Sequence, residues 1–269
     1  MQKPTTPDAE YLPQERQRLI LERLAREGRV VAQDLAQQFN ASEDTIRRDL
    51  RELAASGLCH RVYGGALPRS PANASLAERE TVVPARKQAL GEKLASLLSA
   101  GQVVFVDAGS TNLAAVRALP EGLALIIITN APRIAAEVAE RDGIQLIVVG
   151  GLVDQRTGAA FAARALRDIG DLRPDVYLLG SCALDTVTGI GVYGFDEAEF
   201  KRTMLAQSRR VITAASSDKL GTCAPFAIAP LRVLGDLVLE ADAPTEQIGL
   251  FQQEGVNIHY AAAVPGSAS

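Results

Sequence analysis

Residues 42–50 read Ser-Glu-Asp-Thr-Ile-Arg-Arg-Asp-Leu, and this stretch decides the fold of the first part of the chain. Ser42 is a good helix N-cap, because its hydroxyl can accept a hydrogen bond from a backbone N–H of the first turn. The two acidic residues that follow it suit the positive end of a helix. Apolar residues then recur at spacings of four and three, at Ile46, Leu50 and Leu53. This spacing predicts an amphipathic helix that ends at Gly57.

Helical patterns precede this stretch and a strand pattern follows it. Residues 14–27 carry apolar side chains at helical spacing, and residues 32–39 form a second, shorter helical stretch. Residues 58–67 read as two short strands around a Gly-rich turn, which is typical of a β wing. Three short helices and a wing in this order predict a winged helix-turn-helix domain over residues 12–68.

The polar face of the third helix is rich in arginine, whose guanidinium group suits bidentate contacts with phosphate and guanine. We expect DNA contacts from this helix and from the wing, at Ser42, Thr45, Arg47, Arg48, Arg51, Arg61 and Tyr63. The alternative is a helix with solvated arginines, because Asp49 and Glu52 interleave with them and can form ordinary ion pairs on a helix surface. The order of the helices and the wing favours DNA binding.

The net charge of −4 argues against a protein coated with nucleic acid. It hides an asymmetry, because residues 1–70 hold 11 Lys and Arg against 10 Asp and Glu, whereas the whole chain holds 28 against 32. No apolar run approaches the roughly 20 residues that a membrane-spanning helix needs. The N-terminus also lacks the apolar segment of a secretory signal. We therefore expect a cytoplasmic protein without a membrane partner.

The second part of the chain has the pattern of an α/β domain. Residues 69–85 are rich in Pro, Ser and Ala and predict a linker, after which residues 86–262 form the second domain. Strand-sized apolar runs, mostly separated by helical segments, occur at residues 103–106, 124–128, 144–149, 176–179, 211–215, 233–239 and 256–260. This alternation predicts a mainly parallel sheet with helices on both faces.

Small polar residues follow four of these predicted strands, at residues 107–112, 129–130, 150–151 and 180–181. In a parallel α/β sheet, ligands bind beyond the carboxyl ends of the strands, where backbone N–H groups and hydroxyls at a helix N-terminus can hold a phosphate. Each loop alone is explained by ordinary turn formation, but four together favour a ligand site. The candidates are Asp107, which could accept hydrogen bonds from sugar hydroxyls, with Gly109, Ser110, Thr111, Asn112, Thr129, Asn130, Gly150, Gly151 and Lys219.

Several other patterns carry less weight. Lys201 lies four residues after Glu197, so we expect it to form an ion pair on a helix surface. Residues 189–194 match G-x-G-x-x-G but begin too far beyond a predicted strand for a dinucleotide site, and we expect a mobile loop over the ligand. With only His60 and His259 in the chain, no histidine-based triad or zinc site can be assembled, and no cofactor is expected.

Motifs along both parts of the chain carry a resemblance to one family. The motif S-x-x-T-I-R-R-D-L at residues 42–50 resembles the DNA-binding signature of the DeoR family of bacterial transcription regulators. The segments DAGSTN, TNAPR, VVGG, LLGSCALD, GFDEAEFKRTML and SSDKLG resemble the effector-sensing domain of that family, which is similar in fold to ribose-5-phosphate isomerase. The resemblance implies a phosphorylated sugar as effector, and it adds Asp185 to the candidate residues.

Two functions remain open at this point. The first is a repressor of a carbohydrate catabolic operon that binds double-stranded operator DNA and releases it when a sugar phosphate binds. The second is a sugar-phosphate isomerase or transferase with an accessory N-terminal module. Residues 42–67 favour the repressor, because an enzyme has no need of them. One winged helix makes few base contacts, so we expect a homo-oligomer, a dimer or a tetramer.

Overall fold

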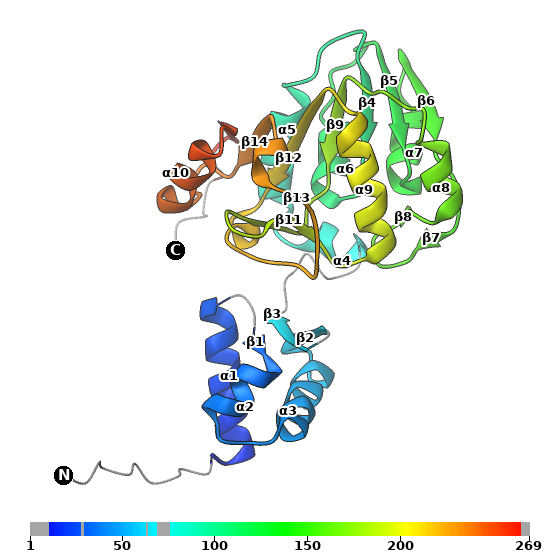
Figure 1. The fold of residues 1–269 in the computed structure, drawn as a ribbon. Helices are drawn as coiled ribbons and strands as arrows, with labels where there is room; N and C mark the ends of the chain where they lie inside the picture. The colour runs from blue at the N-terminus through cyan, green and yellow to red at the C-terminus, as the bar shows by residue number, and fades with distance from the viewer. Residues whose placement is uncertain (1–10, 28–29, 63, 69–75, 265–269) are drawn as a thin grey trace, which may run out of the picture. The chain divides into compact units, whose positions relative to one another are not determined.

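The computed structural model describes residues 11–27, 30–62, 64–68 and 76–264 (Figure 1). The chain separates into two compact units, Met1–Ser70 and Pro71–Ser269. Each unit has its own hydrophobic core. They are called the N-terminal unit and the C-terminal unit below.

The N-terminal unit contains three helices and a small antiparallel sheet. Its elements are α1 (Pro13–Glu27), β1 (Val30–Val31), α2 (Ala32–Gln38), α3 (Glu43–Ala55), β2 (Cys59–Val62) and β3 (Gly65–Pro68), with the sheet order β1-β3-β2. The three predicted helices and the two strands of the wing are confirmed. β1 was not predicted, because two residues are too few to show an alternating pattern. Tyr63 lies outside the described residues.

The apolar faces predicted for these helices form the core of the unit. Ile46, Leu50 and Leu53 of α3 are buried, together with residues of α1 and α2. The Ser42 hydroxyl accepts a hydrogen bond from the Thr45 N–H at 3.1 Å, so the predicted N-cap is confirmed. The helix therefore begins where the sequence places its start.

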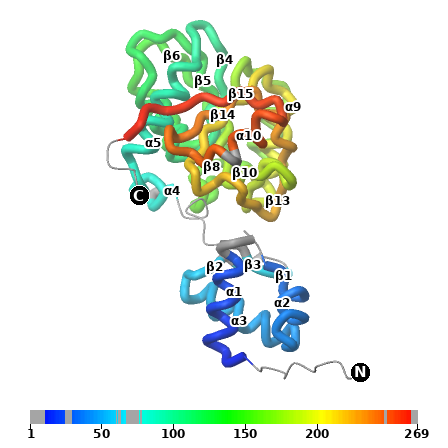
Figure 2. Tube along the Cα trace, turned by 90° about the vertical axis from the view of Figure 1, so that its left-hand side faces the viewer, coloured from blue at the N-terminus to red at the C-terminus, as the bar shows by residue number. Residues whose placement is uncertain are grey.

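The C-terminal unit is built on a seven-stranded parallel sheet with β15 and β6 at its edges (Figures 1 and 2). Along the sheet the order is β15-β14-β12-β9-β4-β5-β6, and every neighbouring pair is parallel. The strands are β4 (Val103–Val106), β5 (Leu125–Thr129), β6 (Ile144–Val148), β9 (Val176–Leu179), β12 (Arg210–Ala215), β14 (Asp236–Leu239) and β15 (Asn257–Tyr260). The seven apolar runs of the sequence correspond to these seven strands.

Helices connect the strands and cover the sheet. They are α4 (Leu76–Thr81), α5 (Pro84–Ala95), α6 (Ser110–Arg117), α7 (Pro132–Ala139), α8 (Ala163–Asp168), α9 (Phe195–Gln207) and α10 (Thr245–Gln253). The strand order reverses at β4, so right-handed crossovers place α6 and α7 on one face and α9 on the other. α5 packs closely on α6. Gly91 permits this approach, because a Cβ at that position would lie 2.6 Å from the Ala114 backbone. No helix among the described residues is long and apolar enough to span a membrane.

Two small antiparallel sheets accompany the large one. The first contains β10 (Ala183–Asp185), β11 (Gly189–Val192) and β13 (Phe226–Ala229), and the second pairs β7 (Val153–Asp154) with β8 (Ala159–Ala160). The prediction of a mobile loop at residues 189–194 is wrong for residues 189–192, which form β11. β11 pairs with strands on both sides, and Ile190 and Val192 are buried. Glycine and branched residues alternate in this segment, which is the pattern of a strand.

The prediction of a linker at residues 69–85 is wrong for residues 76–85, the part that the structure describes. Residues 76–81 form α4, and Pro84 begins α5. The Leu76 side chain is buried, and the Leu76 N–H donates to the Arg156 carbonyl oxygen at 3.1 Å. A helix of six residues with one buried apolar side chain shows no periodicity, so composition alone suggested a linker.

Candidate functional site

A cavity of about 350 Å³ lies beyond the carboxyl ends of the central strands of the C-terminal unit. The strand order reverses between β4 and β9, which is where a parallel α/β sheet leaves a crevice for a ligand. The cavity is lined by residues that follow β4, β9, β12 and β14 and by residues of α4 and α5. Four strand ends therefore contribute to it, as expected, but two of them differ from the four that the sequence predicts.

The loop after β4 and Lys219 line this cavity, as the sequence predicts. Gly109, Ser110, Thr111 and Asn112 form the start of α6, so backbone N–H groups of a helix N-terminus face the space. The Lys219 ammonium donates to the Ser181 carbonyl oxygen at 2.9 Å, and burial lowers the pKa of Lys219. A cation and a helix N-terminus at one cavity form a site for an anion.

Asp107 lies beneath the cavity and does not line it. Its carboxylate accepts hydrogen bonds from the backbone N–H groups of Ala108 at 2.8 Å and Gly180 at 3.1 Å and from the Tyr177 hydroxyl at 3.2 Å. The side chain is fully buried. In this structure the donors around Asp107 all belong to the protein, and its contact with sugar hydroxyls stays a prediction. Gly180 is required here, because a Cβ would lie 2.3 Å from the Ala108 carbonyl oxygen.

Five other candidates also lie away from the cavity: Thr129, Asn130, Gly150, Gly151 and Asp185. Thr129 ends β5, Asn130 follows it, and Gly150 and Gly151 lie just after β6; both strands lie on the side of β4 away from the strand reversal. Thr129 donates to the Val106 carbonyl oxygen, and Asn130 donates to the Ala160 carbonyl oxygen. Asp185 closes the turn after β10 through hydrogen bonds with Val187 and Thr188. These residues shape the loops around the crevice.

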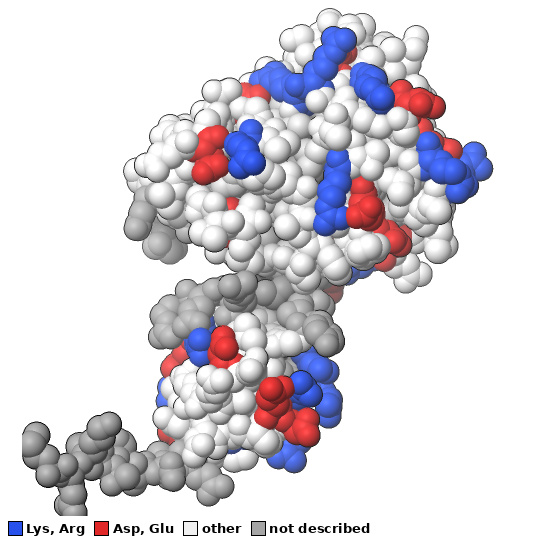
Figure 3. Space-filling view, viewed as in Figure 1, with Lys and Arg blue, Asp and Glu red and all other residues white. Residues whose placement is uncertain are grey.

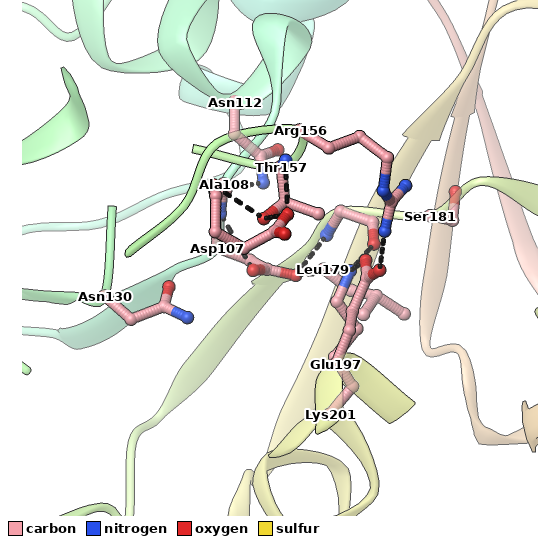
Figure 4. A network of polar contacts seen from close by, with 12 residues as sticks. Asp107, Ala108, Asn112, Asn130, Arg156, Thr157, Leu179, Ser181, Glu197 and Lys201 are labelled. Carbon is pink, nitrogen blue, oxygen red and sulfur yellow. Dashed lines mark hydrogen bonds and ion pairs between the residues drawn. The ribbon is translucent and has the colours of Figure 1, made fainter. Parts of the chain in front are cut away.

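Lys201 is buried and links the two sides of the crevice, so the prediction of a surface ion pair is wrong. Its ammonium lies 3.0 Å from Asp107 Oδ2 and 2.9 Å from Glu197 Oε1, and it also donates to the Gly180 carbonyl oxygen (Figure 4). Its side chain is 2% exposed. The spacing from Glu197 is that of a helical pair, as predicted, but α9 turns both groups inward.

Arg156 extends this network to the loop before β8. Its guanidinium lies 3.3 Å from Glu197 Oε2, on the carboxylate that also binds Lys201 (Figure 4). Burial alone would raise the pKa of Glu197, but Lys201 and Arg156 outweigh it and lower that pKa. Burial likewise opposes the charge of Lys201, yet the carboxylates of Asp107 and Glu197 raise its pKa. The four side chains form a compensated ionic network, and three of them, Arg156, Glu197 and Lys201, line the cavity.

Three further cations face the cavity without an ion-pair partner among the described residues: Arg79, Lys87 and Lys219. Burial lowers the pKa of Lys87 to about 8, and the charges of Lys219 and Arg79 lower it further. Arg79 and Lys87 were missed because they lie in or next to the predicted linker. An excess of unpaired positive charge is a property of a site for an anionic ligand.

The cavity offers several groups for binding, and most of its carboxylates are engaged by cations. Asp107 and Glu197 are bound to Lys201, Glu240 lies 3.1 Å from Arg86, and Asp218 also lines the cavity. Burial raises the pKa of the Cys182 thiol, which keeps it protonated. No group of three or more His, Cys, Asp or Glu side chains in the described part of the chain is placed to hold a metal ion.

In the N-terminal unit, the arginines of α3 are exposed to solvent. Arg47 pairs with Glu43 at 2.6 Å on the same helix, whereas Arg48 and Arg51 form no ion pair with a described carboxylate. The Ser42 and Thr45 hydroxyls lie 2.9 Å apart at the start of the helix. In Figure 3, Lys and Arg side chains of this unit gather where Figure 1 places α3.

Two acids of α3, Asp49 and Glu52, contact α1, whereas Glu43 and Asp44 pair with Arg47 at the start of the helix. Asp49 is buried and binds the Arg16 guanidinium of α1 through two contacts, at 2.5 and 3.2 Å. Glu52 accepts a hydrogen bond from Gln17 at 2.8 Å. The alternative in which Asp49 and Glu52 neutralise the arginines on the helix surface is therefore wrong. Arg61 of β2 is also exposed.

Comparisons with known proteins cover both units. Residues 83–241 match the family described as the DeoR C-terminal sensor domain, and residues 16–71 match the DeoR-like helix-turn-helix domain. The chain is 34% identical over 242 residues to the HTH-type transcriptional regulator GlpR of Haloferax volcanii, covering 87% of this chain and 94% of that protein. It is 29% identical over 226 residues to the glycerol-3-phosphate regulon repressor of Escherichia coli K12, covering 84% and 90%. Ribose 5-phosphate isomerase A from Methanocaldococcus jannaschii is similar in structure, with 14% identity and a TM-score of 0.37 over 51% of this chain and 54% of that chain.

Proposed function

This chain belongs to the DeoR family of transcriptional regulators, and from that premise we propose that it represses a carbohydrate catabolic operon and releases its operator when a phosphorylated sugar binds. The family consists of regulators and not of enzymes, so the isomerase or transferase alternative is set aside. DNA is bound through the helix-turn-helix domain. The ligand and the direction of regulation are the parts that we propose.

The positive charge of the cavity is the observation that supports a phosphorylated ligand. Arg79, Lys87 and Lys219 face it without ion-pair partners among the described residues, and the start of α6 adds backbone donors. A phosphate group matches this combination, because it accepts hydrogen bonds from cations and from helix N-termini. The cavity of about 350 Å³ falls in the range of small-molecule sites.

Repression is proposed from the relatives. The Escherichia coli relative is described as a repressor of the glycerol-3-phosphate regulon. A repressor of catabolic genes is relieved by a metabolite when that metabolite binds better to the state with low operator affinity. The same linkage also requires that operator DNA weaken binding of the metabolite.

We also propose that the protein acts as a homo-oligomer, a dimer or a tetramer. One recognition helix reads only a few base pairs, so specific binding requires at least two half-sites. Sedimentation of the full chain, alone and with operator DNA, tests this proposal. A single monomer on the DNA at saturating protein would contradict it.

Thermal unfolding in the presence of sugar phosphates tests the proposed ligand class. A ligand at 100 times its dissociation constant stabilises the folded state by about 2.7 kcal/mol, which raises the melting temperature measurably. The comparison variant is Lys219→Ala, which removes one cation from the cavity together with its hydrogen bond to the Ser181 carbonyl oxygen. We expect at least one sugar phosphate to stabilise the wild-type protein and not the variant. Equal stabilisation of both proteins, or of neither by any sugar phosphate, would contradict the proposal.

A further inference from the structure

Helix α4 connects the cavity with the part of the chain that leads to the DNA-binding unit. It begins at Leu76, six residues after Ser70, where the N-terminal unit ends. Arg79 of α4 lines the cavity, and so do Val82 and Val83 just beyond the helix. Among the described residues, α4 is therefore the first element of the C-terminal unit, and it reaches the proposed ligand site directly.

Several contacts hold α4 to this unit without using the Arg79 side chain. The Leu76 N–H donates to the Arg156 carbonyl oxygen at 3.1 Å, so the N-terminus of α4 is attached to the loop that contributes Arg156 to the ionic network. Glu80 forms an ion pair with Arg133 of α7 at 2.6 Å. The buried Leu76 side chain also packs against Gly158, where a Cβ would lie 2.8 Å from it.

The joint between α4 and α5 is strained. Val83 has φ of +41° and ψ of 62°, the left-handed region that disfavours β-branched residues. Strain of this kind persists only where the surrounding structure imposes it, and it is concentrated at ligand clamps and switch regions. α4 is thus joined to α5 by a residue whose backbone conformation the surrounding structure imposes.

The guanidinium group of Arg79 has an unused donor. Its Nε is buried and has no hydrogen-bond partner among the described residues. A buried N–H without an acceptor costs free energy, and an anionic acceptor would remove that cost. Arg79 is also close enough to Lys87 and Lys219 for its charge to lower the pKa of both lysines. An anion bound near Arg79, Lys87 and Lys219 would be attracted by the charges of all three.

We propose that Arg79 binds the phosphate of the effector and thereby fixes the position of α4, so that occupancy of the cavity is passed to the segment leading to the DNA-binding unit. The inference rests on the proposed ligand site, and it adds a residue and an element that transmit binding. In the free protein, the contacts that hold α4 include those of Leu76, the Glu80–Arg133 ion pair and a hydrogen bond from the Lys87 ammonium to the Arg79 carbonyl oxygen, and none of these three uses the Arg79 side chain. In the bound protein, Arg79 adds a charged contact from the middle of the helix.

Amide hydrogen exchange of the full chain, with inorganic phosphate as the probe, tests this inference. Each protein is measured without phosphate and with phosphate at ten times its own dissociation constant, determined by calorimetry. In the wild-type protein we expect exchange to slow about tenfold both in α4, residues 76–81, and at the start of α6, residues 110–113. In Arg79→Gln we expect the slowing at α6 to remain and the slowing at α4 to be lost.

Arg167→Gln is the control, because Arg167 is exposed on α8 and does not line the cavity. It should retain slow exchange at both places. Slowing at α4 that persists in Arg79→Gln, or slowing at α6 alone in the wild-type protein, would overturn the role of Arg79 and leave the proposed ligand site intact. Phosphate that slows neither segment of the wild-type protein would overturn the ligand site, and this inference with it.

Discussion

Lys201 is a buried cation that neutralises two buried carboxylates, those of Asp107 and Glu197. Removing one partner of a buried ion pair leaves the other charge uncompensated, which typically costs 3–5 kcal/mol. We therefore expect Lys201→Ala to destabilise the protein by about 3–5 kcal/mol in urea unfolding. Arg164→Ala is the control, because Arg164 is 71% exposed and its pair with Asp168 contributes little. A Lys201→Ala protein as stable as wild type would show that the network does not hold the crevice together.

Lys87 should make both the stability of the protein and its affinity for an anion depend on pH. Burial and the charges of Lys219 and Arg79 lower its pKa to about 8, while Asp218 and Glu80 oppose the shift. Between about pH 8 and 10 the folded protein loses this proton while the unfolded chain keeps it, so this residue makes stability rise with pH in that window. The affinity for an anionic ligand should instead fall as pH rises. The ligand loses the attraction of one positive charge over the same pH range.

We therefore expect phosphate binding to weaken as pH rises through about 8. The second ionisation of a phosphomonoester lies near pH 6, well below this window. Calorimetric titration from pH 7 to pH 9, with a sugar phosphate that stabilises the wild-type protein, measures the effect, and Lys87→Met is the control in which the step should disappear. A step of the same size in Lys87→Met would assign the dependence to another group.

At single positions, the sequence predicts residue chemistry better than residue environment. The spacing of Glu197 and Lys201 correctly predicts a helical pair. The same spacing occurs on exposed and on buried helix faces, so it could not reveal that this pair lies inside the protein. Asp107 illustrates the same point, because a carboxylate at a strand end can face a ligand or support the loop beneath it.

At the scale of the elements, we expect α3 to be the helix that contacts DNA. Its buried face positions Arg48 and Arg51 toward solvent, and its acid Asp49 is directed to Arg16 of α1. We expect Arg48→Ala and Arg51→Ala each to weaken operator binding by about 1–3 kcal/mol where a base contact is lost. A lost phosphate contact would instead lower the salt dependence by about one unit.

Fluorescence anisotropy with labelled operator DNA over a series of salt concentrations measures both effects. Arg18→Ala on α1 is the matched control, because Arg18 is 63% exposed and pairs with Glu22 within its own helix. It should bind the operator nearly as wild type does. Wild-type affinity in both Arg48→Ala and Arg51→Ala would exclude α3 as the recognition helix.

The elements differ in how well the sequence predicts them. α3 was predicted with its N-cap and its buried face, because thirteen residues show a helical period and a cap residue marks their start. α4 was missed, because six residues with one apolar anchor have no period. The stability of α4 comes from contacts with residues far away in the sequence, such as Arg133 and Arg156.

At the scale of the whole molecule, the number of strands was predictable and their order was not. Apolar runs mark all seven strands, and their alternation with helices indicates a parallel sheet. The reversal between β4 and β9 decides which strand ends meet, and it depends on long-range pairing. For this reason the loops after β5 and β6 were included in the candidate site, whereas the contributions of β14, α4 and α5 were missed.

The central claim is that a phosphorylated ligand in the cavity of the C-terminal unit controls the affinity of the N-terminal unit for DNA. The most direct measurement is a titration of sugar phosphates into the full chain bound to operator DNA at fixed salt, with Lys219→Ala beside the wild-type protein. The account predicts that one sugar phosphate releases the wild-type protein, while Lys219→Ala binds the operator equally well and is not released at the same ligand concentration. Release of Lys219→Ala at the wild-type ligand concentration would contradict it.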